Sequence, residues 1–304
     1  MKKFNLSVLA ALTVMFMACE SGYDPDDFAG PGDEDSEGSV VEEGAVNMTF
    51  NIVSVEQVDF ENTTSSTSAT ELSEVCTRID FAAFSESDSK TTYSQTSDDD
   101  DDFGTLSVSL AEGTNRIVIL AHNGTGKASI YRPDSIRFTN NKVTDTFYYY
   151  AEITATEGGS YNVTLTRSVA MFRLIVTDDT PDDVAQMEFY YTGGSSTFDA
   201  TQGLGIVQSR QTETRDVEST AYSGESEYEI YTFPHSTDDY LNITVTALDA
   251  SGNELLEREF EDVPVTINTI TQYTGEFFSE ITESSSSTFS IIIDSEWNKQ
   301  EYTY

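Results

Sequence analysis

Cys19 is the residue best suited to covalent chemistry, because it closes an apolar run near the start of the chain. Lys2 and Lys3 precede this run, which covers residues 6–17, and the small Ala18 stands directly before the cysteine. A positive segment, an apolar segment and a small residue in this order form a cleavable secretion signal. A cysteine at the cleavage point can carry fatty acyl chains such as palmitate, which hold a protein on a membrane surface.

The sequence therefore predicts a bacterial lipoprotein that loses its signal peptide at residues 1–18 and keeps a lipidated Cys19. The apolar run is too short to span a bilayer as a helix, so the lipid would be the only membrane attachment. The protein would then work outside the cytoplasm, tethered to a membrane. An ordinary secretion signal that ends next to a cysteine by chance is the alternative interpretation.

Residues that could hold a metal are few and poorly spaced. The acidic run from Asp98 to Asp102 offers carboxylates for Ca²⁺, but it lacks the alternating spacing and the glycine turn of a Ca²⁺ loop. His122 and His235 are the only histidines, and neither has a histidine or cysteine close by in the sequence. Cys76 is the one cysteine besides Cys19, and we predict that it is a small buried hydrophobic residue. We predict a solvated acidic loop, packing or turn histidines, and no metal, cofactor or disulfide.

Catalytic motifs are also missing from the sequence. It contains neither a G-x-S-x-G nucleophile elbow nor a glycine-rich phosphate loop. Carboxylates are so numerous that nothing singles out a pair for glycoside hydrolysis. We therefore predict no catalytic residues and a protein that is not an enzyme.

The charge balance excludes one large class of partner. The 304 residues include 15 Lys and Arg against 54 Asp and Glu, which gives a formal net charge of −39. Such a chain repels nucleic acid and anionic lipid surfaces alike. Membrane attachment must then come from acyl chains and not from a basic patch.

Short strands dominate the rest of the chain. Residues 19–44 are rich in Asp, Glu and Gly without apolar periodicity, and they predict a flexible acidic tether. From residue 45 onward, runs with a period of two alternate with turn-rich segments, and no long amphipathic helix is indicated. Strands are expected at 46–53, 78–84, 105–110, 116–122, 146–153, 161–165, 169–177, 186–191, 228–233, 240–248, 255–260, 269–278 and 288–294.

This pattern predicts an all-β fold made of two β-sandwiches, at residues 45–166 and 167–304. In the run that opens the second sandwich, Ala170, Phe172, Leu174 and Val176 would form a continuous apolar face. Glycines at 193, 194 and 275 are expected at turns or bulges, and prolines at 234 and 264 at strand ends or edges.

Several segments resemble the FimB-type fimbrial anchor lipoproteins, which are related to the fimbrillins. They cover nearly the whole mature chain in the family's order, although each alone is only a strand and a turn. They are residues 74–81 (EVCTRIDF), 121–124 (AHNG), 167–178 (RSVAMFRLIVTD), 189–196 (FYYTGGSS), 231–234 (YTFP) and 268–278 (NTITQYTGEFF).

The resemblance implies two tandem transthyretin-like β-sandwich domains, an outer-membrane lipid anchor facing the cell surface, and a place at the base of a surface fimbria. Fimbrial stalk or accessory subunits would be the partners. In the related polymerising subunits, a cut after arginine removes the first strand, and a neighbour's strand fills the groove. This chain has no Lys or Arg between Lys3 and Arg78, so we expect it to keep its first strand and to terminate the polymer.

Other interpretations stay open. Trp297, the only tryptophan, would cover the end of the second sandwich, or its tail could dock on another subunit after the flexible serine run at 284–287. A glycan-binding lipoprotein of a nutrient-uptake system could use the tyrosines at 148–150 or 190–191 as sugar platforms, although strand packing explains them more simply. A tip adhesin of the same fimbria is the third interpretation.

Overall fold

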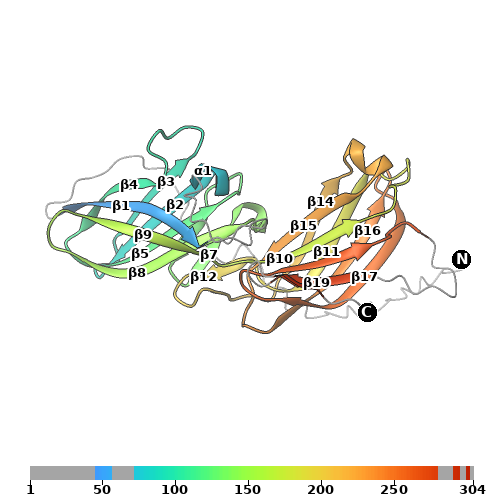
Figure 1. Ribbon diagram of the computed structural model, residues 1–304. Helices are drawn as coiled ribbons and strands as arrows, with labels where there is room; N and C mark the ends of the chain where they lie inside the picture. Colours follow the sequence, from blue (N-terminus) through green and yellow to red (C-terminus); the bar gives the residue numbers. More distant parts are fainter. Residues whose placement is uncertain (1–44, 57–71, 280–289, 295–298, 302–304) are drawn as a thin grey trace, which may run out of the picture. The chain divides into compact units, whose positions relative to one another are not determined.

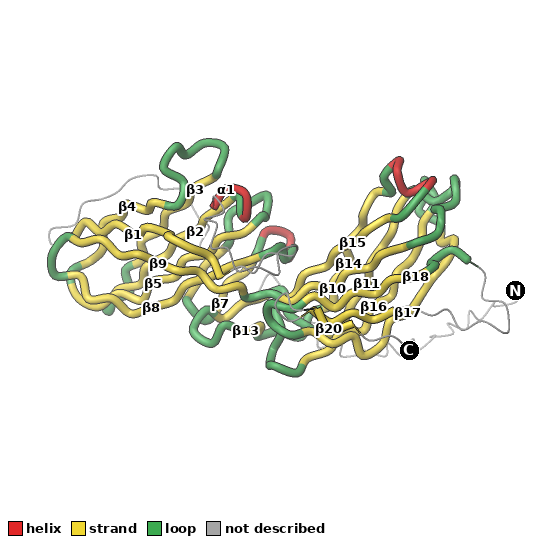
Figure 2. Tube along the Cα trace, viewed as in Figure 1, coloured by secondary structure: helices red, strands yellow, loops and turns green. Residues whose placement is uncertain are grey.

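The computed structural model describes residues 45–56, 72–279, 290–294 and 299–301, and their regular secondary structure is almost entirely β-strand (Figure 1). All of them belong to one compact unit. Within them, helix is confined to short turns: α1 (Leu72–Val75) and two 3₁₀ turns at Thr139–Asn141 and Ser219–Ser223 (Figure 2). The prediction of an all-β protein is confirmed.

The first sheet has seven strands in the order β3-β2-β5-β8-β9-β1-β4. Its inner side encloses one hydrophobic core, in which Phe50, Phe81 and Phe147 are the largest buried side chains. Buried and more exposed residues alternate along β4, so one of its faces enters the core, whereas β2 and β5 are buried on both faces. The strands are β1 (Ala45–Glu56), β2 (Arg78–Ser85), β3 (Lys90–Thr96), β4 (Thr105–Ala111), β5 (Gly113–His122), β8 (Thr146–Ala155) and β9 (Gly159–Arg167).

Two further sheets enclose a second core. Their strand orders are β15-β10-β18-β19-β20 and β14-β11-β16-β17. The strands are β10 (Ala170–Val176), β11 (Gln186–Gly193), β14 (Arg210–Asp216), β15 (Ser226–Thr232), β16 (Asp239–Leu248), β17 (Glu254–Val265), β18 (Ile270–Gly275), β19 (Ser290–Asp294) and β20 (Lys299–Glu301).

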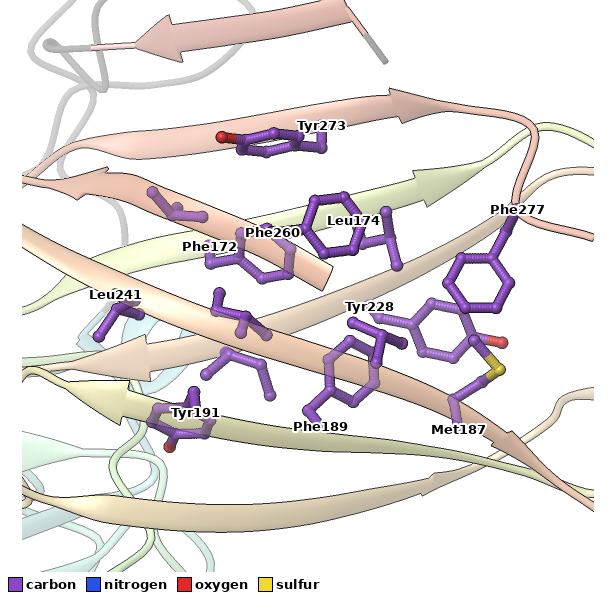
Figure 3. Packing of buried hydrophobic residues seen from close by; sticks show 14 of the residues in the cluster. Phe172, Leu174, Met187, Phe189, Tyr191, Tyr228, Leu241, Phe260, Tyr273 and Phe277 are labelled. Atoms are coloured by element: carbon purple, nitrogen blue, oxygen red, sulfur yellow. The ribbon is translucent and has the colours of Figure 1, made fainter. Parts of the chain in front are cut away.

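The predicted apolar face of β10 lines this second core. Ala170, Phe172, Leu174 and Val176 all belong to it, and Figure 3 shows Phe172 and Leu174 beside side chains of neighbouring strands. The ring centroids of Phe172 and Phe260 lie 5.7 Å apart, within the range of favourable aromatic contact.

A fourth, small sheet has the order β13-β12-β7-β6 and is built from two distant parts of the chain. It covers a third apolar cluster on the outer side of β2, β5 and β8, where Leu120, Phe198 and Phe233 are fully buried. Since this sheet combines residues from both sides of position 167, the division into domains at 45–166 and 167–304 stays a prediction. The four strands are β6 (Ser129–Arg132), β7 (Ser135–Arg137), β12 (Thr197–Asp199) and β13 (Leu204–Gly205).

Glycine and proline fall where the backbone needs them. Gly193 ends β11 with φ of 90°, and a Cβ there would collide with the carbonyl of Tyr240. Pro264 lies in β17, which is an edge strand of its sheet and tolerates a missing N–H.

Candidate functional site

The first strand of the described chain lies inside its sheet. β1 pairs with β4 in the antiparallel sense and with β9 in the parallel sense (Figure 1). Phe50 is opposite Leu106 on one side and Tyr161 on the other. Both backbone edges of β1 are therefore satisfied by strands that come much later in the sequence.

Side chains of β1 hold it there on both faces. On the inner face, Phe50 is fully buried, and its ring centroid lies 5.4 Å from that of Phe81 and 5.7 Å from that of Tyr161. On the outer face, Asn51 Nδ2 donates a hydrogen bond of 2.8 Å to Ser160 Oγ. Removing β1 would expose the edges of β4 and β9 and leave a cavity where Phe50 packs.

Unlike β1, the last strands lie at the margin of their sheet. β18 pairs with β10 in the parallel sense and with β19 in the antiparallel sense, and β20 follows β19 at the margin of the sheet. A strand at a margin is bonded along one edge only, so it leaves the sheet more easily than an internal strand.

Two charged side chains hold the backbone that leads out of β18. Asp178 accepts hydrogen bonds of 2.8 Å from the backbone N–H groups of Phe277, Phe278 and Ser279. Arg258 donates from Nε and Nη2 to the carbonyl of Phe277, and from Nη2 to that of Ser279. Sequence reasoning missed both residues, because their backbone partners are far away in the chain.

A buried arginine ties β9 to two other segments. The Arg167 guanidinium forms two hydrogen bonds of 2.7 and 2.8 Å with the Asp145 carboxylate, and a third of 3.0 Å with Asn268 Oδ1. The same guanidinium lies 4.6 Å from the ring centroid of Phe147. With 2 % of its surface exposed, Arg167 is a fully paired buried cation.

The family model of fimbrillin-A associated anchor proteins, Mfa1 and Mfa2, matches residues 49–303 of this sequence. This match begins within β1 and runs beyond β20. The chain belongs to this family of fimbrial anchor proteins. Membership confirms the resemblance drawn from the sequence segments and associates the chain with fimbriae and their subunits.

Several solved structures match this chain at low sequence identity. A proposed polysaccharide-binding protein from Bacteroides thetaiotaomicron is 8 % identical, with 85 % of this chain and 98 % of that one covered and a TM-score of 0.49. An adhesin candidate from Bacteroides ovatus is 12 % identical over 81 % and 93 %, also with a TM-score of 0.49. The fimbrial anchor protein Mfa2 from Porphyromonas gingivalis is 9 % identical over 85 % and 100 %, with a TM-score of 0.45. No curated protein matches this chain.

The lipidation residue predicted for this anchor-family chain, Cys19, lies outside the described residues, as do the tether at 19–44, the serine run at 284–287 and Trp297. Across the described ranges, no helix is long and apolar enough to cross a membrane. Lipid attachment therefore stays a prediction.

The other cysteine is buried. Cys76 has no exposed surface and its Sγ lies 3.5 Å from the carbonyl oxygen of Leu72. Burial, with a smaller contribution from Asp145, raises the pKa of the Cys76 thiol to about 12. Such a thiol stays protonated at neutral pH and is a poor nucleophile.

The acidic run is part of an ordered turn. Asp100 Oδ2 accepts a hydrogen bond of 2.7 Å from the backbone N–H of Thr96, and Asp102 Oδ1 accepts one of 3.1 Å from Gln95 Nε2. Among the described residues, no group of His, Cys, Asp and Glu is arranged to hold a metal ion. These carboxylates stabilise the turn that leads into β4.

Both histidines serve packing and turns. His122 is fully buried, with Nε2 at 2.9 Å from Asp80 Oδ2, while its Nδ1 accepts a hydrogen bond of 3.0 Å from the N–H of Gly124. His235 lies in the turn after β15, where Nδ1 faces Asp239 Oδ2 at 2.8 Å and Nε2 faces the carbonyl of Val207 at 2.9 Å.

Most of the tyrosines weighed as sugar platforms are occupied by packing. Tyr148 and Tyr150 pack against the cluster under the small sheet, and Tyr149 packs against the first core. Tyr191 is buried and donates a hydrogen bond of 2.8 Å to Glu213 Oε1, while Tyr190 is 41 % exposed. Packing thus accounts for four of these five tyrosines, and Tyr190 is the most exposed of them.

Proposed function

We propose that this chain is a non-enzymatic outer-membrane lipoprotein that anchors or terminates a surface fimbria. The observation that carries this proposal is the position of β1 between β4 and β9. A subunit whose first strand fills its own sheet offers no groove there to a neighbour's strand. It can occupy an end of a polymer but not its middle.

The sequence before β2 supports permanent retention of β1. Arg78 is the first Lys or Arg after Lys3, and it is the half-buried first residue of β2. An arginine-directed protease of the kind that matures related stalk subunits has no site at which to release β1. The fully buried Phe50 adds a packing penalty to any such release.

Docking would use the other end of the chain. β19 and β20 lie at the margin of their sheet, so their backbone groups could pair with a stalk subunit by strand addition. Asp178 and Arg258 would keep residues 277–279 attached to the sandwich while the later strands engage the partner. The sheet that contains β1 would thus accept no further strand at that place, whereas the margin formed by β19 and β20 could pair with a partner's strand.

The proposed attachment to the membrane depends on Cys19. The signal-like run before it and the acidic segment after it agree with lipidation at the outer membrane and exposure at the cell surface. The net charge of −39 leaves acyl chains as the attachment that the sequence favours.

Two other functions are compatible with the same family. A tip adhesin would also end the fibre, at its far end. A glycan-binding lipoprotein would need an exposed aromatic platform, and Tyr190 is the most exposed of the tyrosines weighed for it, whereas Tyr148, Tyr149 and Tyr150 are half-buried. A glycan array tests that function: binding lost on Tyr190→Ala or Tyr148→Ala would favour it over the fimbrial role.

Immunogold labelling of the chain on fimbriated cells separates base from tip. The anchor function predicts gold particles at the cell surface where each fibre begins. Label at the free ends of fibres would overturn the anchor function in favour of a tip adhesin. Label that is unrelated to fibres would favour glycan binding.

A further inference from the structure

An acidic cleft lies beside β15, at one margin of the second core's five-stranded sheet. Its volume is about 650 Å³. Residues 142–145, the end of β14 and most of β15 contribute to its walls. It adjoins neither β1 nor the sheet margin formed by β19 and β20, so the proposed fimbrial docking does not use it.

The backbone of β15 is open toward this cleft. β15 pairs with β10 along one edge and is the last strand of its sheet on the other. The Glu229 carbonyl points away from β10, because it accepts a hydrogen bond of 3.2 Å from Arg215 Nη2 on β14. Peptide groups of alternate residues point the same way along a strand, so those of Glu227 and Tyr231 also face outward.

The side chains around this edge are mostly acidic. Six carboxylates line the cleft, against the two cations Lys142 and Arg215. Within the part of the chain that the structure describes, Asp216, Glu218 and Glu225 form no ion pair. The cleft therefore holds an excess of negative charge next to a strand edge that pairs with no other strand of the sheet.

Arg173 forms ion pairs with two of these carboxylates. Arg173 Nε lies 2.8 Å from Glu227 Oε1, and its Nη2 lies 2.6 Å from Glu229 Oε1. Burial raises the pKa of the Glu227 carboxyl, and the opposing effect of Arg173 does not cancel this, since Glu229 and Glu225 are close. A further cation at this place would relieve the local excess of negative charge.

We propose that the outer edge of β15 binds an extended, cationic segment of a partner protein by strand addition. Its main chain would pair with Glu227, Glu229 and Tyr231. Side chains on the solvent face would lie opposite Glu227 and Glu229, so the site fits a segment with Lys or Arg at every second position.

A second copy of this chain does not fit the same edge. Two β15 strands side by side would bring their glutamates together, which is unfavourable across a strand pair. With 15 Lys and Arg in 304 residues, the chain offers few cationic segments of its own. Charge complementarity therefore selects a different, basic partner.

The test is fluorescence anisotropy of the full-length chain in detergent with a labelled peptide of alternating lysine and valine. Binding is expected, and it should weaken as salt is added, because exposed charges are screened. A peptide of alternating glutamate and valine should not bind. Failure of the lysine peptide to bind, or equal binding of both peptides, would overturn the proposal.

Variants of the protein locate the site. The double substitution Glu225→Gln and Glu227→Gln should weaken binding by about tenfold and reduce its salt dependence. The matched pair Glu257→Gln and Glu259→Gln on β17 changes the same charge at another edge and should leave binding unchanged. Equal losses from both pairs would show general charge attraction and contradict a site at β15.

Backbone pairing needs its own test. Glu227→Pro removes an outward N–H that β10 does not use, and it should weaken binding by about tenfold through one lost main-chain bond. If this variant does not fold, a lysine and valine peptide that is N-methylated at alternate residues gives the same information. Full affinity of the methylated peptide would show that no strand is added.

Discussion

At the scale of single residues, the most constrained side chain in the described chain is Arg167. Its guanidinium is buried and pairs with Asp145 and Asn268 while it lies over the ring of Phe147. These contacts join β9, the segment before β8 and the segment before β18. A buried charge with a full set of partners is costly to break, because truncation strands the opposite charge.

Arg167→Ala should therefore lower the free energy of unfolding by about 3–5 kcal/mol, because it empties the buried guanidinium site and leaves the half-buried Asp145 carboxylate unpaired. Urea denaturation followed by circular dichroism measures this change. Arg132→Ala is the matched control, since Arg132 pairs with Asp134 at the surface, where such pairs contribute about 0–1 kcal/mol. Equal effects of the two substitutions would contradict the role given to Arg167.

Asp239 gives the stability of the second sandwich a pH dependence. Burial alone would raise the pKa of this carboxyl, but hydrogen bonds from the backbone and ring of His235 and from the N–H of Tyr240 outweigh it. The pKa of Asp239 is therefore lower in the folded chain than its ordinary value of 3.8. The stabilisation is present above that ordinary value and is lost as the pH falls through the lowered one.

Asp239→Asn should lower the melting temperature at neutral pH, and the difference from the wild type should shrink as the solution is acidified below the lowered pKa. Thermal melts over a series of acidic pH values measure this. The exposed neighbour serves as control: Asp238→Asn should shift the melting temperature little at any pH. A difference for Asp239→Asn that is constant with pH would disprove the argument.

At the scale of elements, β1 is the strand on which the functional argument depends. Phe50→Ala should destabilise the protein by about 3–5 kcal/mol, the usual cost of removing a buried phenylalanine ring. Val53→Ala on the same strand is the control, because Val53 is 58 % exposed and should cost little. Urea denaturation compares the two. Similar small losses would show that β1 adds little to the fold.

Trypsin tests whether the native chain keeps β1. Its first possible cut after Lys3 is at Arg78, the first residue of β2, which is paired with β3 and β5, so brief digestion of folded protein should leave residues 45–56 covalently joined to β2. Mass spectrometry of the products reads this out, with urea-unfolded protein as the cleavable control. Release of a fragment that ends at Arg78 from folded protein would contradict retention.

The elements also show what the sequence could and could not predict. Strands with one apolar face, such as β4, β10 and β16, lie within a few residues of their predicted bounds. β3 and β14 were not predicted, because they are edge strands without a continuous apolar face; β14 reads RQTETRD. The four short strands of the small sheet carry too few residues to show any period.

The sequence did not indicate which strands pair with each other. β1 lies parallel to β9, more than a hundred residues later, and alternation of residues does not say which strands become neighbours. The same holds for Arg167, whose position was noted but whose partners Asp145 and Asn268 were not foreseen. The prediction that Cys76 is buried needed only its residue type, and it is confirmed.

The molecule as a whole has a first strand that is paired on both edges, a last pair of strands at the margin of a sheet, and a strongly negative charge. The chain belongs to the fimbrial anchor family, and the terminal position that we propose for it in a fimbria would account for these features together. A terminal subunit needs one end that accepts no further strand and another that holds the fibre. The lipid expected at Cys19 would attach this subunit, and with it the fimbria, to the cell.

The most direct test is the amount of fimbrial polymer that is bound to cells and the amount that is shed into the medium. It is measured in the wild type, in a strain that lacks the gene, and in that strain complemented with Cys19→Ala or with the wild-type chain. The account predicts shedding in the deletion strain and in the Cys19→Ala strain, with wild-type complementation restoring attachment. Fibres that stay on the cells without this protein would contradict the central claim that it is their anchor.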